Sequence, residues 1–428
     1  MFSLVVLTIC CITLLSSALA FSYSTSTTSN SNHRIPTRQH NDDVLYKMIR
    51  FFGIDMVDTT TNRFYYYCYP IDGKCEHVHM PIRDLAAAWD ASKALQYLVD
   101  INVDEDEVML IRQQLKDAIK HTLSIYQSNL QNIESGDGVH LSEDMLLETS
   151  TIGHSALLLL GICNACSLSI LNQNEAVIQE IDGLVQGILS QQLDNGAFDI
   201  EFNSSKDTNY LRGIEFFPGE AMLALLSAHD ILLSIPTSAT TCQSIIQSMD
   251  KAFAFYSNYY YTEEDVDINY NIWQVLCFSK YHDTLSIDSN NQQVKINIEE
   301  VKKYVLEMCQ EICQSRSWKY QLLRGQSFYQ NIETVEIACG LDALAEGIRI
   351  NRQEDTKDTE DLDKLFTMHA KNALYFIQWT QDQVSNECIV GYGGLGYGGI
   401  QVFEQRLDVT GHAISALVKL HKLAVTIP

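Results

Sequence analysis

One pattern occurs three times in this sequence: Gly153-His154-Ser155-Ala156-Leu157, Gly219-Glu220-Ala221-Met222-Leu223 and Gly411-His412-Ala413-Ile414-Ser415. The first two copies lie 66 residues apart, and the second and third lie 192 apart, close to three further steps of 64. A fixed period indicates a repeat architecture. It predicts three more repeat starts, at Ala86-Ala87-Ala88-Trp89 and within residues 269–276 and 333–341.

Each repeat contains an apolar helical run followed by a more amphipathic one, as in residues 157–166 and 175–192. A single helix pair cannot cover its own apolar face, so consecutive pairs are expected to stack and share a core. Six pairs can close into a ring with the more apolar helix of each pair inside. The sequence therefore predicts an all-α fold of six helical hairpins, in which the inner helices are parallel and begin at one end.

Composition agrees with one large helical domain. Apolar residues make up 46% of the chain, charged residues 19%, and only 6 of 428 residues are proline. No Pro/Gly/Ser linker divides the chain after residue 45, so we predict a single domain over residues 45–428.

A short β-hairpin is predicted ahead of the first helix. Aromatic residues lead from Arg63 to an Asp72-Gly73 turn, and Cys68 and Cys75 lie on opposite arms at a spacing that suggests a disulfide. The other cysteines fall mostly within helical runs, which favours buried thiols.

The N-terminal residues indicate targeting. Residues 1–20 are apolar and end in Ala18-Leu19-Ala20, which predicts a signal peptide. Residues 21–44 are rich in Ser and Thr, and they are interpreted as either a disordered or a transit-like segment. The predicted location is the secretory pathway or outside the cell, with a plastid reached through a two-part presequence as the alternative. A net charge of −25 argues against nucleic acid, and no membrane contact is predicted after signal cleavage.

Titratable residues gather at the predicted repeat starts, where parallel helix N-termini would share one cavity. Acids there are also explained as helix caps, arginines as structural ion pairs and histidines as core residues. The functional interpretation gives acid/base roles to Glu220 and Asp408, with His412 and His154 as alternates. The residues predicted to bind substrate are Arg83, Arg212, Glu215, Arg406, Tyr392 and Trp89. No nucleophile signature is present, and neither a metal nor a cofactor is predicted.

Three segments carry a resemblance to a known group. They are Arg83-Asp84-Leu85-Ala86-Ala87-Ala88-Trp89, Phe216-Phe217-Pro218-Gly219-Glu220-Ala221, and Arg406-Leu407-Asp408-Val409-Thr410-Gly411-His412-Ala413. In this order, they resemble a family of bacterial proteins placed with the six-hairpin, or (α/α)6, toroid superfamily. The resemblance implies the fold. The superfamily includes glycoside hydrolases, polysaccharide lyases, sugar epimerases and terpenoid cyclases, so the scaffold alone does not choose a reaction. The absence of an Asp-x-Asp-Asp run disfavours the cyclases.

Together, the resemblance and the predicted cavity favour a carbohydrate-active enzyme. It would be a hydrolase, lyase or epimerase that acts on a small-molecule or oligosaccharide substrate, with the arginines holding an anionic group where the saccharide is acidic. The alternative is a toroid that binds glycans or proteins without chemistry.

Overall fold

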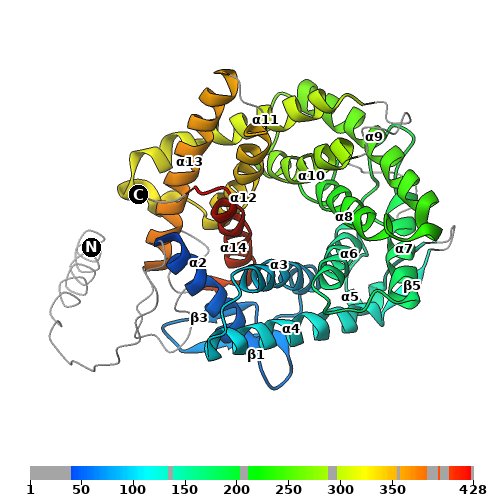
Figure 1. Ribbon diagram of the computed structural model, residues 1–428, viewed down its shortest axis with the longest axis horizontal. Coiled ribbons are helices and arrows are strands. Elements are labelled where there is room, and N and C mark those ends of the chain that lie inside the picture. Colours follow the sequence, from blue (N-terminus) through cyan, green and yellow to red (C-terminus); the bar gives the residue numbers. More distant parts are fainter. Residues whose placement is uncertain are drawn as a thin grey trace, which may run out of the picture. The chain divides into compact units, whose positions relative to one another are not determined.

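Six helices at the predicted repeat starts form a closed inner ring (Figure 1). In chain order they are α3 (Pro81–Asp100), α6 (Ile152–Ser167), α8 (Phe217–Leu232), α10 (Ile268–Ile287), α12 (Thr334–Asn351) and α14 (Leu407–Lys422). Each contacts the next, and α14 contacts α3. The computed structural model describes residues 40–133, 138–202, 211–287, 296–353, 357–382, 394–395 and 404–425, all within one compact unit. The predicted ring is confirmed.

An outer helix follows each of the first five inner helices. These are α4 (Asp106–Gln127), α7 (Glu175–Ser190), α9 (Ala239–Thr262), α11 (Ile298–Gln314) and α13 (Lys357–Asp382). The sixth hairpin is completed by α2 (His40–Arg50), which packs against α14 from the other end of the chain. Helix α2 begins ahead of the predicted domain start at residue 45. The predicted signal peptide and residues 21–39 lie outside the described residues.

Burial distinguishes the inner helices from the outer ones. In α6, the run from Leu157 to Leu160 is no more than 2% exposed. A helix that is apolar on all sides is stable only inside a core. Outer helix α11 instead buries one face and exposes charged residues such as Glu299 and Glu300. The more apolar helix of each pair therefore lies inside, as predicted.

Contacts between neighbouring inner helices show that they run parallel. Arg83 near the start of α3 pairs with Asp408 near the start of α14. The buried Asp342 of α12 accepts a hydrogen bond from Ser415 of α14, and each lies eight residues after the start of its helix. The helix N-termini consequently gather at one end of the ring.

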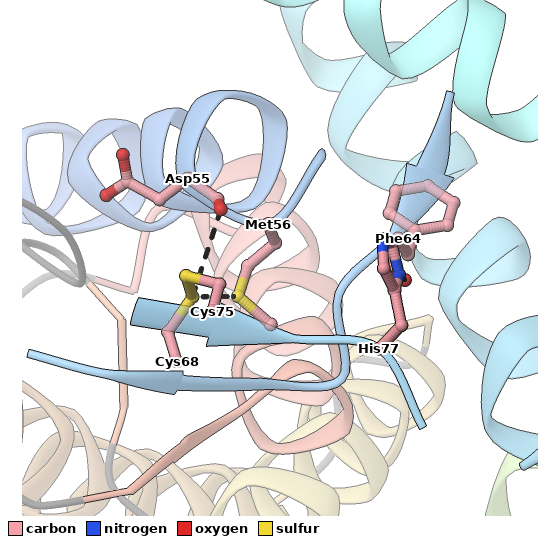
Figure 2. The surroundings of a disulfide bond; sticks show 6 residues. All are labelled: Asp55, Met56, Phe64, Cys68, Cys75 and His77. Atoms are coloured by element: carbon pink, nitrogen blue, oxygen red, sulfur yellow. Dashed lines mark hydrogen bonds between the residues drawn. A yellow bond between two sulfur atoms is a disulfide. The ribbon is translucent and has the colours of Figure 1, made fainter. Parts of the chain in front are cut away.

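The predicted hairpin consists of β3 (Tyr67–Tyr69) and β4 (Lys74–Glu76), with Cys68 opposite Cys75. The two cysteines form the predicted disulfide, and the Cys68 sulfur packs 3.1 Å from Met56 Sδ (Figure 2). Gly73 in the turn has φ of 63°, a conformation that glycine adopts readily. A third strand, β7 (Gln405–Arg406), pairs with β3 and was not predicted. It joins the hairpin to the start of α14.

Short elements complete the described structure. Two more antiparallel pairs join β1 (Val57–Asp58) to β2 (Arg63–Phe64) and β5 (Leu130–Asn132) to β6 (Val139–Leu141). The remaining helical segments are α5 (Glu143–Leu146), η1 (Phe51–Asp55), η2 (Pro236–Ser238), η3 (Arg316–Gln321), η4 (Leu322–Arg324) and η5 (Gln326–Asn331). The free cysteines among the described residues are buried except for the half-buried Cys339, as predicted. Within the described part of the chain, every helix is too short or too polar to cross a bilayer.

Candidate active site

Asp408 is the centre of a charge cluster at the N-terminal end of the inner ring. Its carboxylate is buried and accepts hydrogen bonds from Arg406 Nε at 3.0 Å and from the Tyr66 hydroxyl at 3.3 Å. Arg83 Nη1 of α3 lies 3.2 Å from its Oδ2. Residues near the N-terminal β-hairpin, from α3 and from β7 thus hold one carboxylate in place.

Local structure explains this arrangement. Arg406 ends β7, and the backbone N–H of Leu407 donates to the carbonyl of Tyr66 at 3.1 Å. The sheet therefore holds Tyr66 and Arg406 next to each other, with the guanidinium 5.5 Å from the ring centroid, at the first turn of α14. A carboxylate in this turn is favoured by the helix dipole. Burial raises the pKa of Asp408, but the charges of Arg83 and Arg406 outweigh that effect. The pKa of Asp408 lies below its ordinary value of 3.8, so this group is ionised at neutral pH.

The pKa of Glu220 is shifted in the opposite direction. The residue lies in the first turn of α8, where only 7% of its surface is exposed, and Oε2 has no hydrogen-bond partner among the described residues. Burial raises its pKa to about 8, and the positive charge of Arg83 offsets this only in part. At neutral pH, Glu220 is therefore an uncharged acid.

Gly153 explains how α6 and α8 approach each other beside Glu220. A Cβ at this position would overlap the ring of Phe217 and lie 2.9 Å from Glu220 Oε2. The glycine of the repeated pattern is thus required by close packing. That packing also removes water from the Glu220 carboxyl.

Aromatic rings fill the ring interior next to this cluster. Trp89 of α3 and Trp273 of α10 stack with centroids 6.1 Å apart, and His412 lies edge-on to Trp273 at 6.2 Å. His412 is 8% exposed and lies within electrostatic range of Asp408. The predicted residues Glu220, Asp408, His412, Arg83, Arg406 and Trp89 are consequently placed around the interior of one ring.

His154 has a different position. Its Nδ1 lies 2.9 Å from the Thr151 hydroxyl and its Nε2 lies 3.1 Å from Glu148, so it forms the capping box of α6. Burial is the main cause that lowers its pKa, despite the neighbouring Glu148. Gly153, not His154, faces Glu220. The alternate acid/base role of His154 stays a prediction.

Two further residues have contacts other than those expected. Arg212 is 72% exposed at its side chain and pairs with Glu201 at 2.7 Å, not with the half-exposed Glu215. Neither Arg212 nor Glu215 makes a recorded contact with Glu220 or Asp408. Tyr392 lies outside the described residues.

Sequence reasoning missed Tyr66 and Trp273 as members of the site. Tyr66 belongs to the predicted hairpin, but the third strand that brings it to Asp408 left no recognisable pattern. Trp273 is the sixth residue of α10, as His412 is of α14, so aligning helix starts would have found it. No group of three or more His, Cys, Asp or Glu in the described residues is arranged to hold a metal ion.

Comparison with known proteins identifies the architecture. No family model matches the sequence, and no curated protein does. The structure is similar to the GH76 α-mannanase of Bacteroides thetaiotaomicron, with TM-score 0.51, 10% identity, and 90% of this chain and 97% of that chain covered. This chain has the (α/α)6 toroid fold. It is also similar to the unsaturated glucuronyl hydrolase of Bacillus sp. GL1, with TM-score 0.54, 10% identity, and coverage of 90% and 98%. A toroid fold shared at this identity does not select a reaction, so the chemistry is argued from the site.

Proposed function

We propose that this toroid is a carbohydrate-active enzyme that uses Glu220 as general acid and Asp408 as general base. The observation that carries the proposal is that Arg83 acts electrostatically on two carboxyls at the end of the ring where the inner helices begin. The Glu220 carboxyl is buried, with no hydrogen-bond partner for Oε2 among the described residues, whereas the Asp408 carboxylate is fully paired. Two carboxyls whose environments move their pKa values apart are suited to acid and base roles at one pH. The similar solved structures belong to enzymes that act on carbohydrates, which supports a saccharide substrate.

Arg83 is proposed to hold an anionic group of the substrate. It pairs with Asp408 through Nη1, its Nε is buried without a partner among the described residues, and 39% of its side chain is exposed. A guanidinium that keeps free N–H groups can bind a carboxylate. Uronic-acid-containing saccharides are therefore the favoured substrates.

The test uses neutral and uronic-acid-containing oligosaccharides with product analysis by mass spectrometry. Hydrolysis adds the mass of water, elimination yields an unsaturated product, and epimerisation leaves the mass unchanged. Glu220→Gln and Asp408→Asn are each expected to lower kcat/KM by about 10²- to 10⁴-fold. Glu299→Gln is the matched control, because the same change is made at an exposed carboxyl of outer helix α11.

The expected pH profile follows from the two carboxyls. Activity requires protonated Glu220, so it falls as pH rises through about 8. It also requires ionised Asp408, so it falls only below pH 3.8. Unchanged turnover in both variants would refute the assignment. Saccharide binding without any product, after prolonged incubation, would favour a binding toroid instead.

A further inference from the structure

A cavity of about 230 Å³ lies away from the helix N-termini, toward the opposite end of the inner ring. Its lining includes Lys280 and Asp283 in the last part of α10 and Lys419 near the end of α14. Trp89 lines it too, and the stacked pair of Trp89 and Trp273 lies between this cavity and the start of α14. The cavity is therefore distinct from the cluster around Asp408.

Charges of both signs line the cavity and are paired with one another. Lys419 Nζ lies 2.8 Å from Asp342 Oδ1 and 2.8 Å from Glu346 Oε1. Arg349 bridges Glu346 at 2.7 Å and Asp283 at 2.8 Å. Asp342 and Glu346 are only 1% and 15% exposed at their side chains, so the network is held rigidly.

The two remaining cations have their partners just behind the wall. Lys93 pairs with the buried Asp90 at 3.3 Å, and Lys280 pairs with Asp230. Four cations in the lining thus face three carboxylates in the lining and two behind it. A ligand with net charge of either sign consequently gains little here.

Hydrogen-bonding capacity nevertheless remains. A lysine ammonium has three N–H donors. Lys280 uses one of them in its ion pair with Asp230, and Lys419 uses two in its ion pairs with two carboxylates. The carboxylates have more lone pairs than partners. Leu223 and Leu276 add an apolar wall, while Lys93 covers the Trp89 ring at 3.3 Å from its centroid.

We propose that this cavity binds a small, uncharged, polyhydroxylated molecule, up to about the size of a monosaccharide. Each hydroxyl can accept from a lysine and donate to a carboxylate, and the C–H faces can pack on Leu223 and Leu276. An uncharged ligand is favoured because every cation in the lining already has a carboxylate partner, and each of these five carboxylates has a cation partner. This site does not depend on the proposed chemistry of Glu220.

The experiment measures binding to the full-length protein by ligand-observed NMR and calorimetry. Glucose and myo-inositol are the neutral probes, and glucuronate and glucosamine are charged probes of similar size. The neutral probes are expected to bind with millimolar dissociation constants. The charged probes should bind at least fivefold more weakly, so tighter binding of either charged probe would overturn the proposed ligand class.

Three variants test whether the ligand binds in this cavity. Leu223→Trp fills the cavity and should abolish binding, whereas Leu233→Trp, at a 56% exposed position after the same helix, should leave it unchanged. Lys280→Met removes one donor at the rim and should weaken binding by roughly fivefold. It also tests the site if Leu223→Trp does not fold.

Two results would overturn the inference. One is the absence of neutral-probe binding at millimolar concentrations, and the other is wild-type binding in both cavity variants. Glu220→Gln should bind the neutral probes as the wild type does. If Glu220→Gln alone abolishes binding, the ligand sits at the proposed active site, and the second site is refuted.

Discussion

Replacing Glu220 by Gln is expected to change the pH dependence of stability. Glu220 has a pKa of about 8 in the folded protein, against an ordinary value of 4.5. Because its pKa is raised on folding, its stabilising contribution is complete below pH 4.5 and is lost as pH rises through about 8. Each pH unit within this window costs about 1.4 kcal/mol. Between pH 4.5 and pH 7, this single group therefore removes about 3 kcal/mol from the free energy of unfolding.

The side chain of Glu220→Gln is uncharged at every pH, so this variant does not lose stability in this way as pH rises. The buried amide adds an unpaired N–H, which costs about 1–3 kcal/mol, but this cost is equal at both pH values. The difference in stability between variant and wild type should thus move by about 3 kcal/mol in favour of the variant from pH 4.5 to pH 7. In a chain of this size, that corresponds to roughly 4 °C in Tm.

Calorimetric Tm values at pH 4.5 and pH 7 test this expectation, with Glu215→Gln as the matched control. The control replaces a half-exposed carboxyl and should show no comparable change with pH. If the Tm difference between Glu220→Gln and wild type is the same at both pH values, then Glu220 is not held as an uncharged acid. The proposed acid role would fail with it.

Three further changes test the architecture. Cys75→Ser removes the disulfide of a short loop and should cost about 2 kcal/mol, with a Tm that no longer responds to dithiothreitol. Asp408→Ala leaves two arginines without their shared carboxylate and should cost about 3–5 kcal/mol in denaturant unfolding; a loss below 1 kcal/mol would contradict the buried ion-pair arrangement. Gly411→Ala places a methyl group against Asp90 and should destabilise by about 1–3 kcal/mol. Gly161→Ala, which meets only the movable end of a leucine, is its control and should be near neutral in Tm.

The repeated glycines made the fold predictable, and the structure gives the physical reason. A Cβ at Gly153 would meet Phe217, one at Gly219 would meet Trp273, and one at Gly411 would meet Asp90. Each glycine marks a place where the first turn of an inner helix packs closely against another inner helix. The spacing of these glycines in the sequence therefore reflects the close packing of one inner helix against another around the ring.

Ion-pair partners could not be read from neighbouring positions. Asp84 directly follows Arg83 in the sequence, but adjacent helical residues point in different directions. Asp84 instead accepts a hydrogen bond from Tyr126 at 2.9 Å, and Arg83 reaches Asp408 near the other end of the chain. Outer helix α2 was missed for a related reason, because the hairpin it completes joins opposite ends of the sequence.

The charged groups at the two ends of the inner ring differ in their pairing. This difference distinguishes the end proposed for catalysis from the end proposed for ligand binding. Toward the C-terminal end, Lys419 and Arg349 are paired, and the charges of Lys419 and Arg349 lower the pKa of Glu346 to about 2 against the effect of its burial. Such a network resists changes of protonation. At the N-terminal end, Glu220 keeps a buried carboxyl that has no hydrogen-bond partner in the described part of the chain, at a cost in stability above pH 4.5. A glutamine of the same shape would avoid that pH-dependent cost. A glutamate, unlike a glutamine, carries a proton that it can transfer to a substrate.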